Sequence, residues 1–105
     1  MDSQNGKVTL INMLKVDPSR QEALIALLKD NIDNVIRTMS GWMGTSLVAA
    51  LDKSTVTIIS HWRSVEYAGA MRTDPRMLAY FPKIRELAEF DSVLGMEVFD
   101  ARVST

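Results

Sequence analysis

The sequence predicts an α+β domain whose elements follow the order β-α-β-β-α-β. Three observations support this prediction. An alternating apolar segment precedes a long segment of helical periodicity, two strand-like segments flank a short polar turn, and two short helical segments precede a last strand-like segment. This order is the ferredoxin-like arrangement, here with the second helix split in two. The 105 residues suffice for one domain, and we expect residues 1–7 to form a flexible tail before a domain at 8–105.

The first predicted strand, at residues 7–16, is apolar on both faces. Alternation separates its side chains into two sets. A sheet that is apolar on both sides needs a cover for each, so we expect helices on one face and a second copy of the chain on the other. One set contains Val8, Leu10, Asn12, Leu14 and Val16, and the other contains Thr9, Ile11, Met13 and Lys15.

A long helix is predicted after this strand. Asp17 and Pro18 end the strand, and Ser19 with Glu22 has the spacing of a capping box, so we expect a helix from Ser19 to about residue 39. Its apolar residues recur at helical spacing and predict one face packed against the sheet. Asn31 lies at the edge of that apolar stripe.

The middle of the chain predicts an antiparallel hairpin. Residues 42–51 and 55–62 read as strands, and the short turn at residues 52–54 joins them. Alternation along the second strand places Ile58, Ser60 and Trp62 on one face and His61 on the other.

Two short helices and a strand complete the pattern. Ser64 is positioned to cap a helix that ends at about residue 72, and Asp74 with Pro75 begins another that ends at about residue 88. Pro82 is expected to kink the second of these helices, because proline removes a helix hydrogen bond. Residues 90–103 supply the last predicted strand.

Composition excludes several classes of function. The chain is 47% hydrophobic and 24% charged with a net charge of -1, which gives no electrostatic reason to expect nucleic acid or a membrane as partner. It has no cysteine, so thiolate chemistry and cysteine metal sites are absent. A polar N-terminus and short apolar runs predict a cytoplasmic protein.

Asn12 is the clearest anomaly in the pattern. An amide in the middle of an apolar strand face costs about 1–3 kcal/mol if it stays unpaired. It therefore needs either a structural partner, such as the backbone or buried water, or a ligand. The residues alone favour the structural partner slightly.

Residues 56–82 carry a family resemblance. They read VTIISHWRSVEYAGAMRTDPRMLAYFP. In this segment a strand ends at Trp62, Ser64 caps a helix that contains Tyr67, and an Asp-Pro pair then begins a second helix. This order resembles the antibiotic biosynthesis monooxygenase superfamily. Its members are small dimeric α+β barrels that include cofactor-independent oxygenases and haem-degrading enzymes. The resemblance extends over residues 8–99 and implies a homodimer with one cleft per subunit.

The resemblance implies a set of site residues. Asn12 matches an asparagine that faces the cleft, Trp62 matches a tryptophan that lines it, and Tyr67 falls near a tyrosine that contacts substrate; these three are the candidate catalytic residues. A lone tryptophan at the end of a strand is about as often a core aromatic as a residue that lines a cleft. Arginines on short helices are usually solvated, and this applies to Arg72, Arg76 and Arg85. The candidate substrate-binding residues are Asn31, Ile58, Ser60, Arg72, Tyr80 and Phe81.

No cofactor is expected. His61, the sole histidine, lies on the strand face away from Trp62, and residues 64–88, where haem-degrading relatives carry their axial ligand, contain none. Haem degradation is therefore disfavoured, although Tyr80 could take a similar place. Oxygenase relatives can carry an asparagine where this chain has Ile58. No motif for NAD, flavin or ATP occurs.

Two functions follow from the resemblance. The first is a cofactor-independent monooxygenase that oxidises a phenol, an anthrone or a hydroquinone with dioxygen. In such enzymes the deprotonated aromatic substrate itself reduces dioxygen, and the protein binds and positions it. The alternative is a dimeric ligand-binding or stress-associated barrel without turnover, because this fold has many non-enzymatic members.

Overall fold

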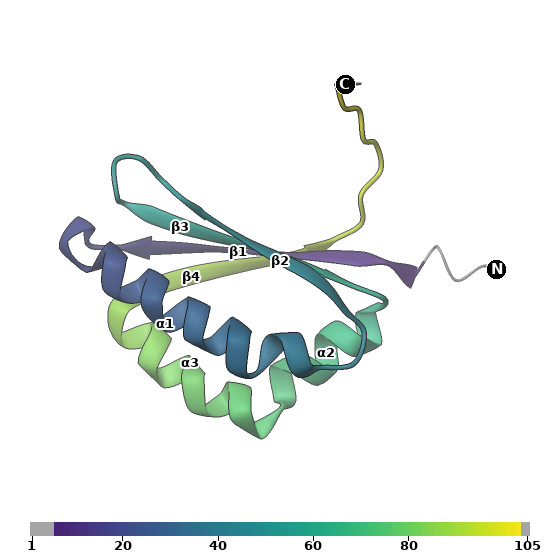
Figure 1. The fold of residues 1–105 in the computed structure, drawn as a ribbon, viewed down its shortest axis with the longest axis horizontal. Helices are drawn as coiled ribbons and strands as arrows, with labels where there is room; N and C mark the ends of the chain where they lie inside the picture. The colour runs from purple at the N-terminus through teal and green to yellow at the C-terminus, as the bar shows by residue number, and fades with distance from the viewer. Residues whose placement is uncertain (1–5, 104–105) are drawn as a thin grey trace.

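A computed structural model describes residues 6–103. Its four strands form one antiparallel sheet in the order β2-β3-β1-β4, and helices α2 and α3 are the two parts of the split second helix. The predicted α+β ferredoxin-like architecture is confirmed (Figure 1). In chain order the elements are β1 (Val8–Val16), η2 (Pro18–Arg20), α1 (Gln21–Asn34), η3 (Ile36–Thr38), β2 (Trp42–Ala49), β3 (Thr55–Trp62), α2 (Val65–Thr73), α3 (Pro75–Leu87) and β4 (Ala88–Gly95).

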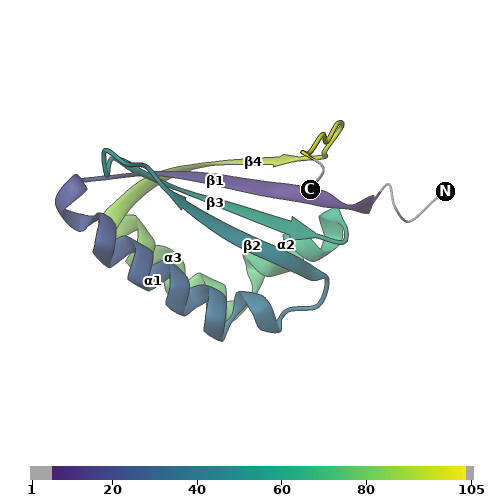
Figure 2. The ribbon, with the colours of Figure 1, turned by 45° about the horizontal axis from the view of Figure 1, so that its top comes forward.

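All three α-helices of residues 6–103 cover the same face of the sheet, and no helix from this part of the chain lies on the other face (Figure 2). The core lies between the helices and the covered face, in two clusters. One cluster lies at the α2 end of the sheet and contains Leu10, Trp62 and Met71, whereas the other contains Leu14, Leu24 and Val56. None of the described helices is long and apolar enough to cross a membrane.

The first helix differs from its prediction at both ends. Asp17, not Ser19, is the cap: its Oδ1 accepts a hydrogen bond from the Ser19 backbone N–H at 2.9 Å, with Pro18 in the first turn. Helix α1 then begins at Gln21. It ends at Asn34, because Val35 has φ -126° and ψ -62°, outside the helical range, and a 3₁₀ turn carries the chain on to Thr38.

The two helices of the second half begin as predicted. The Ser64 hydroxyl accepts from the Tyr67 N–H at 3.3 Å, and Asp74 Oδ1 accepts from the Arg76 N–H at 2.8 Å. Helix α3 continues as one element through Pro82. The hairpin turn also forms where expected, with Asp52 accepting from the Ser54 N–H at 2.9 Å.

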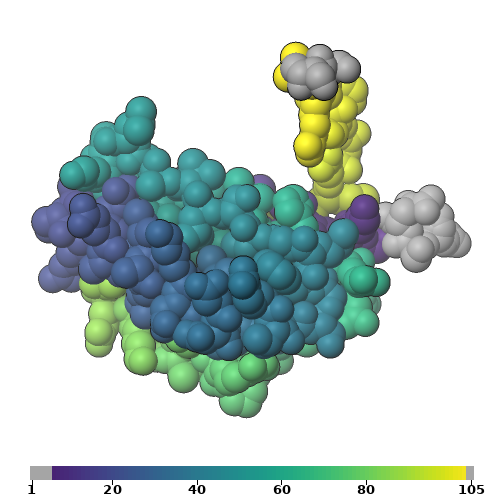
Figure 3. Space-filling view, in the orientation of Figure 1, coloured from purple at the N-terminus to yellow at the C-terminus, as the bar shows by residue number. Residues whose placement is uncertain are grey.

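The last strand is shorter than predicted and starts earlier. It spans Ala88–Gly95, and its pairing with β1 runs from Val16↔Ala88 to Thr9↔Gly95. Strand β4 lies at the sheet edge and has β1 as its single partner, so its pairing stops where β1 ends. Residues 96–103 leave the sheet on the side away from the helices (Figures 1 and 3). The predicted tail at 1–7 lies mostly outside the described residues.

The face of the sheet without helices is apolar at its centre. Ile11 of β1 pairs with Ile59 of β3 on one side and with Val93 of β4 on the other. Ile11 is 37% exposed and Val93 is 61% exposed. An exposed row of large aliphatic side chains is typical of an interface between subunits.

We predict that this face forms a homodimer interface. Ile11→Glu places a charge at the centre of the row and should convert a dimer to a monomer without unfolding it, since Ile11 does not belong to the core. Obligate interfaces bury about 2,000 Å² or more in total. Sedimentation at micromolar concentration measures both states, and Lys15→Glu, at the end of the same strand face, is the matched charge control. A wild-type protein that sediments as a monomer would contradict the prediction.

Candidate active site

A cavity of about 290 Å³ lies between the covered sheet face and the helices. This volume is near the lower end of the range for small-molecule sites. Its sheet side presents Asn12, Ile58 and Ser60 among aliphatic neighbours. The residues that α1, α2 and α3 contribute are mostly apolar or cationic, namely Leu28, Asn31, Ile32, Met71, Arg72, Met77, Phe81, Ile84 and Arg85.

The cavity brings together six of the predicted site residues. Two lie on β3, one on β1, and one each on α1, α2 and α3; they are Asn12, Asn31, Ile58, Ser60, Arg72 and Phe81. Three predicted residues, Trp62, Tyr67 and Tyr80, do not line it. Alternation along β1 and β3 accounts for Asn12, Ile58 and Ser60, since it directs these strand residues to the helix-covered face.

Asn12 has the partner that the sequence required. The hydroxyl of Ser92 on β4 donates a hydrogen bond to Asn12 Oδ1. In the sheet register, Asn12 lies between Ile58 of β3 and Ser92 of β4, so all three side chains share the covered face. The sequence analysis missed Ser92. Alternation places Ser92 on the same face of the last strand as Phe90, and the sequence contains that signal. Its pairing with Asn12 depends on how β1 and β4 are aligned, which the sequence does not show.

A chain of hydrogen bonds crosses from β2 to β3 beside the cavity. The indole Nε1 of Trp42 donates to Thr45 Oγ1 at 2.8 Å, and Thr45 Oγ1 lies 3.0 Å from Ser60 Oγ. Thr45 and Ser60 line the cavity and are paired across the sheet. Trp42 and Thr45 were also missed, because strict alternation places residues three apart on opposite faces.

Trp62 is in the core rather than on the cavity surface. It is 0% exposed and packs in the cluster that contains Leu10 and Met71, both of which do line the cavity. Its indole Nε1 has no hydrogen-bond acceptor among the described residues. A buried donor without a partner costs about 1–3 kcal/mol, and this one lies in the core cluster rather than on the cavity surface.

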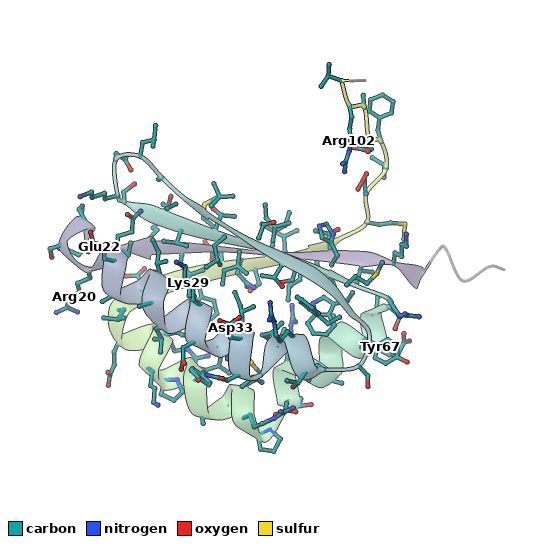
Figure 4. The ribbon with its side chains drawn as sticks, in the orientation of Figure 1. Arg20, Glu22, Lys29, Asp33, Tyr67 and Arg102 are labelled. Carbon is teal, nitrogen blue, oxygen red and sulfur yellow. The ribbon has the colours of Figure 1, made fainter. Side chains whose placement is uncertain are left out.

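Tyr67 lies outside the cavity, near the start of α2 (Figure 4). It is 40% exposed, and its ring lies against the backbone of Gly41. A Cβ at position 41 would fall 2.2 Å from the Tyr67 Cγ, and Gly41 has φ +81°, so the position requires glycine on both counts. The observed contact of Tyr67 is therefore one of packing.

Tyr80 joins helices α3 and α1 outside the cavity. Its hydroxyl donates to Asp30 Oδ2 at 2.7 Å, and Asn34 Nδ2 donates to Asp30 Oδ1 at 2.7 Å. The hydrogen bond to Asp30 raises the pKa of Tyr80 above its usual value, because ionisation would place two anions in contact. The pair holds together the two helices that cover the cavity.

The charged groups of the cavity are arginines. Arg72 and Arg85 line it, whereas no aspartate, glutamate or histidine of the described residues does. Among residues 6–103, neither arginine has a carboxylate within 4.0 Å, in contrast to Arg76, whose Nε is 3.1 Å from Asp74 Oδ1. The Arg85 guanidinium lies 5.9 Å from the Phe81 ring centre and 5.7 Å from that of Phe90. The two charged side chains that line the cavity are thus both cations, and both are exposed.

The described residues contain no group of three or more His, Cys, Asp or Glu side chains that could hold a metal ion. Asn31 is the remaining polar group of the helix side. It is 4% exposed, and its Nδ2 donates to the Met77 sulfur at 3.2 Å. Sulfur is a weak acceptor, and the Oδ1 of Asn31 remains available to a ligand.

Comparison with known proteins gives a consistent family. The family model described as "Antibiotic biosynthesis monooxygenase" matches residues 7–83. A curated protein, tetracenomycin-F1 monooxygenase of Streptomyces glaucescens, is 30% identical over 80 residues, which cover 76% of this chain and 71% of that protein.

Solved structures share the fold. Rv0793 from Mycobacterium tuberculosis has a TM-score of 0.79 and 22% identity over 91% of this chain and 99% of its own. SnoaB from Streptomyces nogalater, described as a cofactor-independent oxygenase, has a TM-score of 0.70 and 20% identity over 94% of this chain and 96% of its own. These likenesses show the fold.

The raised pKa of Tyr80 generates a prediction about alkaline stability. A raised folded-state pKa stabilises the protein fully below the unfolded value of about 10, and that contribution is lost as pH rises through the folded value. Wild-type stability should therefore fall more steeply above about pH 10 than that of Tyr80→Phe, as followed by urea unfolding. Tyr67→Phe, which removes the hydroxyl of the other tyrosine, is the matched control. Parallel curves for wild type and Tyr80→Phe would contradict the role of the Asp30 contact.

Proposed function

Because the chain belongs to the antibiotic biosynthesis monooxygenase family, we propose that it is a cofactor-independent monooxygenase acting on an electron-rich aromatic compound. A phenol, an anthrone or a hydroquinone fits this description. The observation that carries the proposal is the cavity itself, whose apolar walls suit a flat ring and whose polar groups are mostly hydrogen-bond donors. The names of two relatives, a monooxygenase and a cofactor-independent oxygenase, support it.

The proposed reaction needs only substrate and dioxygen. An anthrone loses a proton from its ring CH₂ group to give an enolate, which passes one electron to dioxygen. The resulting radical and superoxide combine in a new carbon–oxygen bond, and protonation gives a hydroperoxide. Loss of water then leaves a carbonyl group, so one oxygen atom enters the product and the other leaves in water with the two substrate hydrogens.

The residues of the cavity would act by binding and orientation. Asn12 and Ser60 would hold substrate oxygen atoms, and Phe81 would pack against the ring. Arg72 and Arg85 would favour the anion, so the substrate proton can leave to solvent through the mouth of the cavity. The exposed lining residues, which mark this mouth, are Arg72 of α2, Arg85 of α3 and Ser92 of β4.

Because Trp62 does not line the cavity, we propose that its unpaired indole N–H reaches the substrate or dioxygen when ligand binding displaces Leu10 or Met71, its neighbours in the core cluster. Tyr67 and Tyr80 were candidates for handling the proton, but their contacts are with Gly41 and Asp30. We assign them instead to the support of the helices around the cavity. Ile58 would contribute an apolar surface beside Asn12.

One observation favours the alternative function, a ligand-binding protein without turnover. No aspartate, glutamate, histidine or tyrosine of the described residues lines the cavity. The site therefore has no side chain of the kind that usually acts as a general base. Oxidation is then possible only for substrates acidic enough to ionise on binding.

Oxygen consumption distinguishes the two functions. Purified protein, free of metal and flavin, should accelerate dioxygen uptake by anthrones such as dithranol or by naphthohydroquinones above the spontaneous rate. A chelator should leave the rate unchanged, since the proposed electron donor is the substrate. Tight binding of the same compounds without uptake would instead establish the ligand-binding function.

Substitutions at Asn12 and Trp62 test the site assignment. Asn12→Ala removes a positioned amide, and Trp62→Phe removes the indole donor while most of the ring volume remains. Each should lower turnover by about 10²-fold. Melting temperature should change little for Trp62→Phe, because the lost N–H had no partner to begin with.

The opposite order of effects would contradict the assignment. If either variant melts far lower yet oxidises dithranol at the parental rate where it is folded, that residue only packs. Tyr67→Phe serves as the control, because it keeps the ring against Gly41 and removes only the hydroxyl. Loss of turnover in this variant would restore a catalytic role for Tyr67.

A further inference from the structure

We propose that Met77 is a modification site: an organic hydroperoxide held in the cavity oxidises its thioether to the sulfoxide, and Asn31 determines which of the two sulfoxide epimers forms. The natural source of the oxidant rests on the proposed function, because that reaction passes through a hydroperoxide in the same cavity. The site itself depends only on the placement of two methionines and on one hydrogen bond.

Exposure separates the methionines of the cavity from those of the surface. In the single subunit Met13, Met43 and Met96 are 49%, 45% and 57% exposed, so a peroxide in solution reaches them directly. Met71 and Met77 are 6% and 4% exposed, and both line the cavity. An oxidant that fills the cavity therefore contacts two thioethers that bulk solvent hardly reaches.

Met77 differs from Met71 in having a hydrogen bond at its sulfur. Asn31 of α1 donates from Nδ2 to the Sδ of Met77, on α3, at 3.2 Å, and no residue among 6–103 donates to the sulfur of Met71. A thioether has no proton to donate, so the amide nitrogen and not the amide oxygen faces the sulfur. Asn31 is itself 4% exposed and lines the same cavity, so packed protein holds the pair in place.

This hydrogen bond makes the two lone pairs of the Met77 sulfur inequivalent. One lone pair accepts from Asn31, which leaves the other as the place where oxygen can add. A sulfoxide is chiral, so addition at one lone pair gives one epimer. A methionine that moves freely in solvent offers both lone pairs and gives both epimers. A single epimer is therefore expected when Met77 is oxidised in the folded protein.

The oxygen transfer needs no reactant besides the hydroperoxide. The free lone pair of the Met77 sulfur attacks the outer oxygen of R–O–O–H, the O–O bond breaks, and the hydroperoxide proton passes to the departing R–O⁻. The sulfur loses two electrons and becomes the sulfoxide, while the hydroperoxide is reduced to the alcohol R–OH. Confinement of both groups in one cavity favours this transfer over reaction with the exposed methionines.

Oxidation by cumene hydroperoxide tests the site without any turnover. This aromatic hydroperoxide suits the apolar walls of the cavity, whereas hydrogen peroxide, the comparison, has no apolar group to bind there. Peptide mass spectrometry measures the oxidised fraction of each methionine. The ratio of Met77 to Met96 oxidation should be about tenfold higher with cumene hydroperoxide than with hydrogen peroxide. Cumyl alcohol, which lacks the O–O bond, should compete for the cavity and slow the oxidation of Met77 but not that of Met96.

The epimer formed at Met77 is the second readout. The two classes of methionine sulfoxide reductase each reduce one epimer, so each can be applied to the digested protein. One class should reduce nearly all of the Met77 sulfoxide from folded wild-type protein, whereas each should reduce about half of it when the chain is oxidised in urea. Asn31→Leu removes the donor and should yield both epimers. Met71→Leu is the matched control, because it removes the other cavity thioether and should retain the single epimer at Met77.

Thermal melting confirms that each variant is folded, and the wild-type measurements test the proposal even if Asn31→Leu does not fold. Equal ratios of Met77 to Met96 oxidation with the two peroxides would overturn it. A mixture of epimers at Met77 in folded wild-type protein would do so as well. A single epimer that persists in folded Asn31→Leu would overturn the role of Asn31.

The two proposals can fail separately. If cumene hydroperoxide oxidises Met77 preferentially and to one epimer but no anthrone consumes dioxygen, the modification site stands and the monooxygenase function falls. If the protein accelerates dioxygen uptake by dithranol while the two peroxides give the same ratio of Met77 to Met96 oxidation, the function stands and the modification site falls.

Discussion

The register of β1 between β3 and β4 is the constraint on which the candidate site depends. It places Asn12 between Ile58 and Ser92 and directs all three toward the helices. A shift of one residue would turn every side chain of β1 to the other face and put Met13 where the amide now lies. The aliphatic residues on either side of Asn12, Leu10 and Leu14, prevent that shift, because both are almost fully buried in the core clusters.

The sheet side of the cavity carries several polar side chains among its aliphatic residues. Polar side chains in an apolar layer must be paired to avoid a desolvation cost, and here hydroxyls from neighbouring strands supply the partners. Ser92 pairs with Asn12, and Thr45 pairs with Ser60. Each pairing uses acceptor capacity and leaves a donor. The pairing that stability requires therefore also determines which hydrogen-bonding groups are left for a ligand.

Alternation allowed part of the site to be predicted from the sequence. Asn12, Ile58 and Ser60 follow directly from the period of two along their strands. Trp62 obeys the same alternation, but it lies at the end of β3, where Ala68 and Met71 of α2 pack in the same cluster. Burial by a helix that follows in the chain is a tertiary effect, which strand periodicity cannot indicate. Thr45 and Ser92 required the β-bulge between Trp42 and Gly44 and the register, and neither can be read from one strand alone.

The two tyrosines show how residues outside the cavity can determine its shape. Tyr80 joins α3 to α1 through Asp30, and these are the helices that supply Asn31 and Phe81 to the cavity. Tyr67 packs α2 against the backbone of Gly41, next to Trp42. These contacts hold α1 against α3, and α2 against the residue before β2, from outside the cavity. Because Gly41 directly precedes Trp42, the contact of Tyr67 also fixes where the hydrogen-bond chain to Ser60 begins.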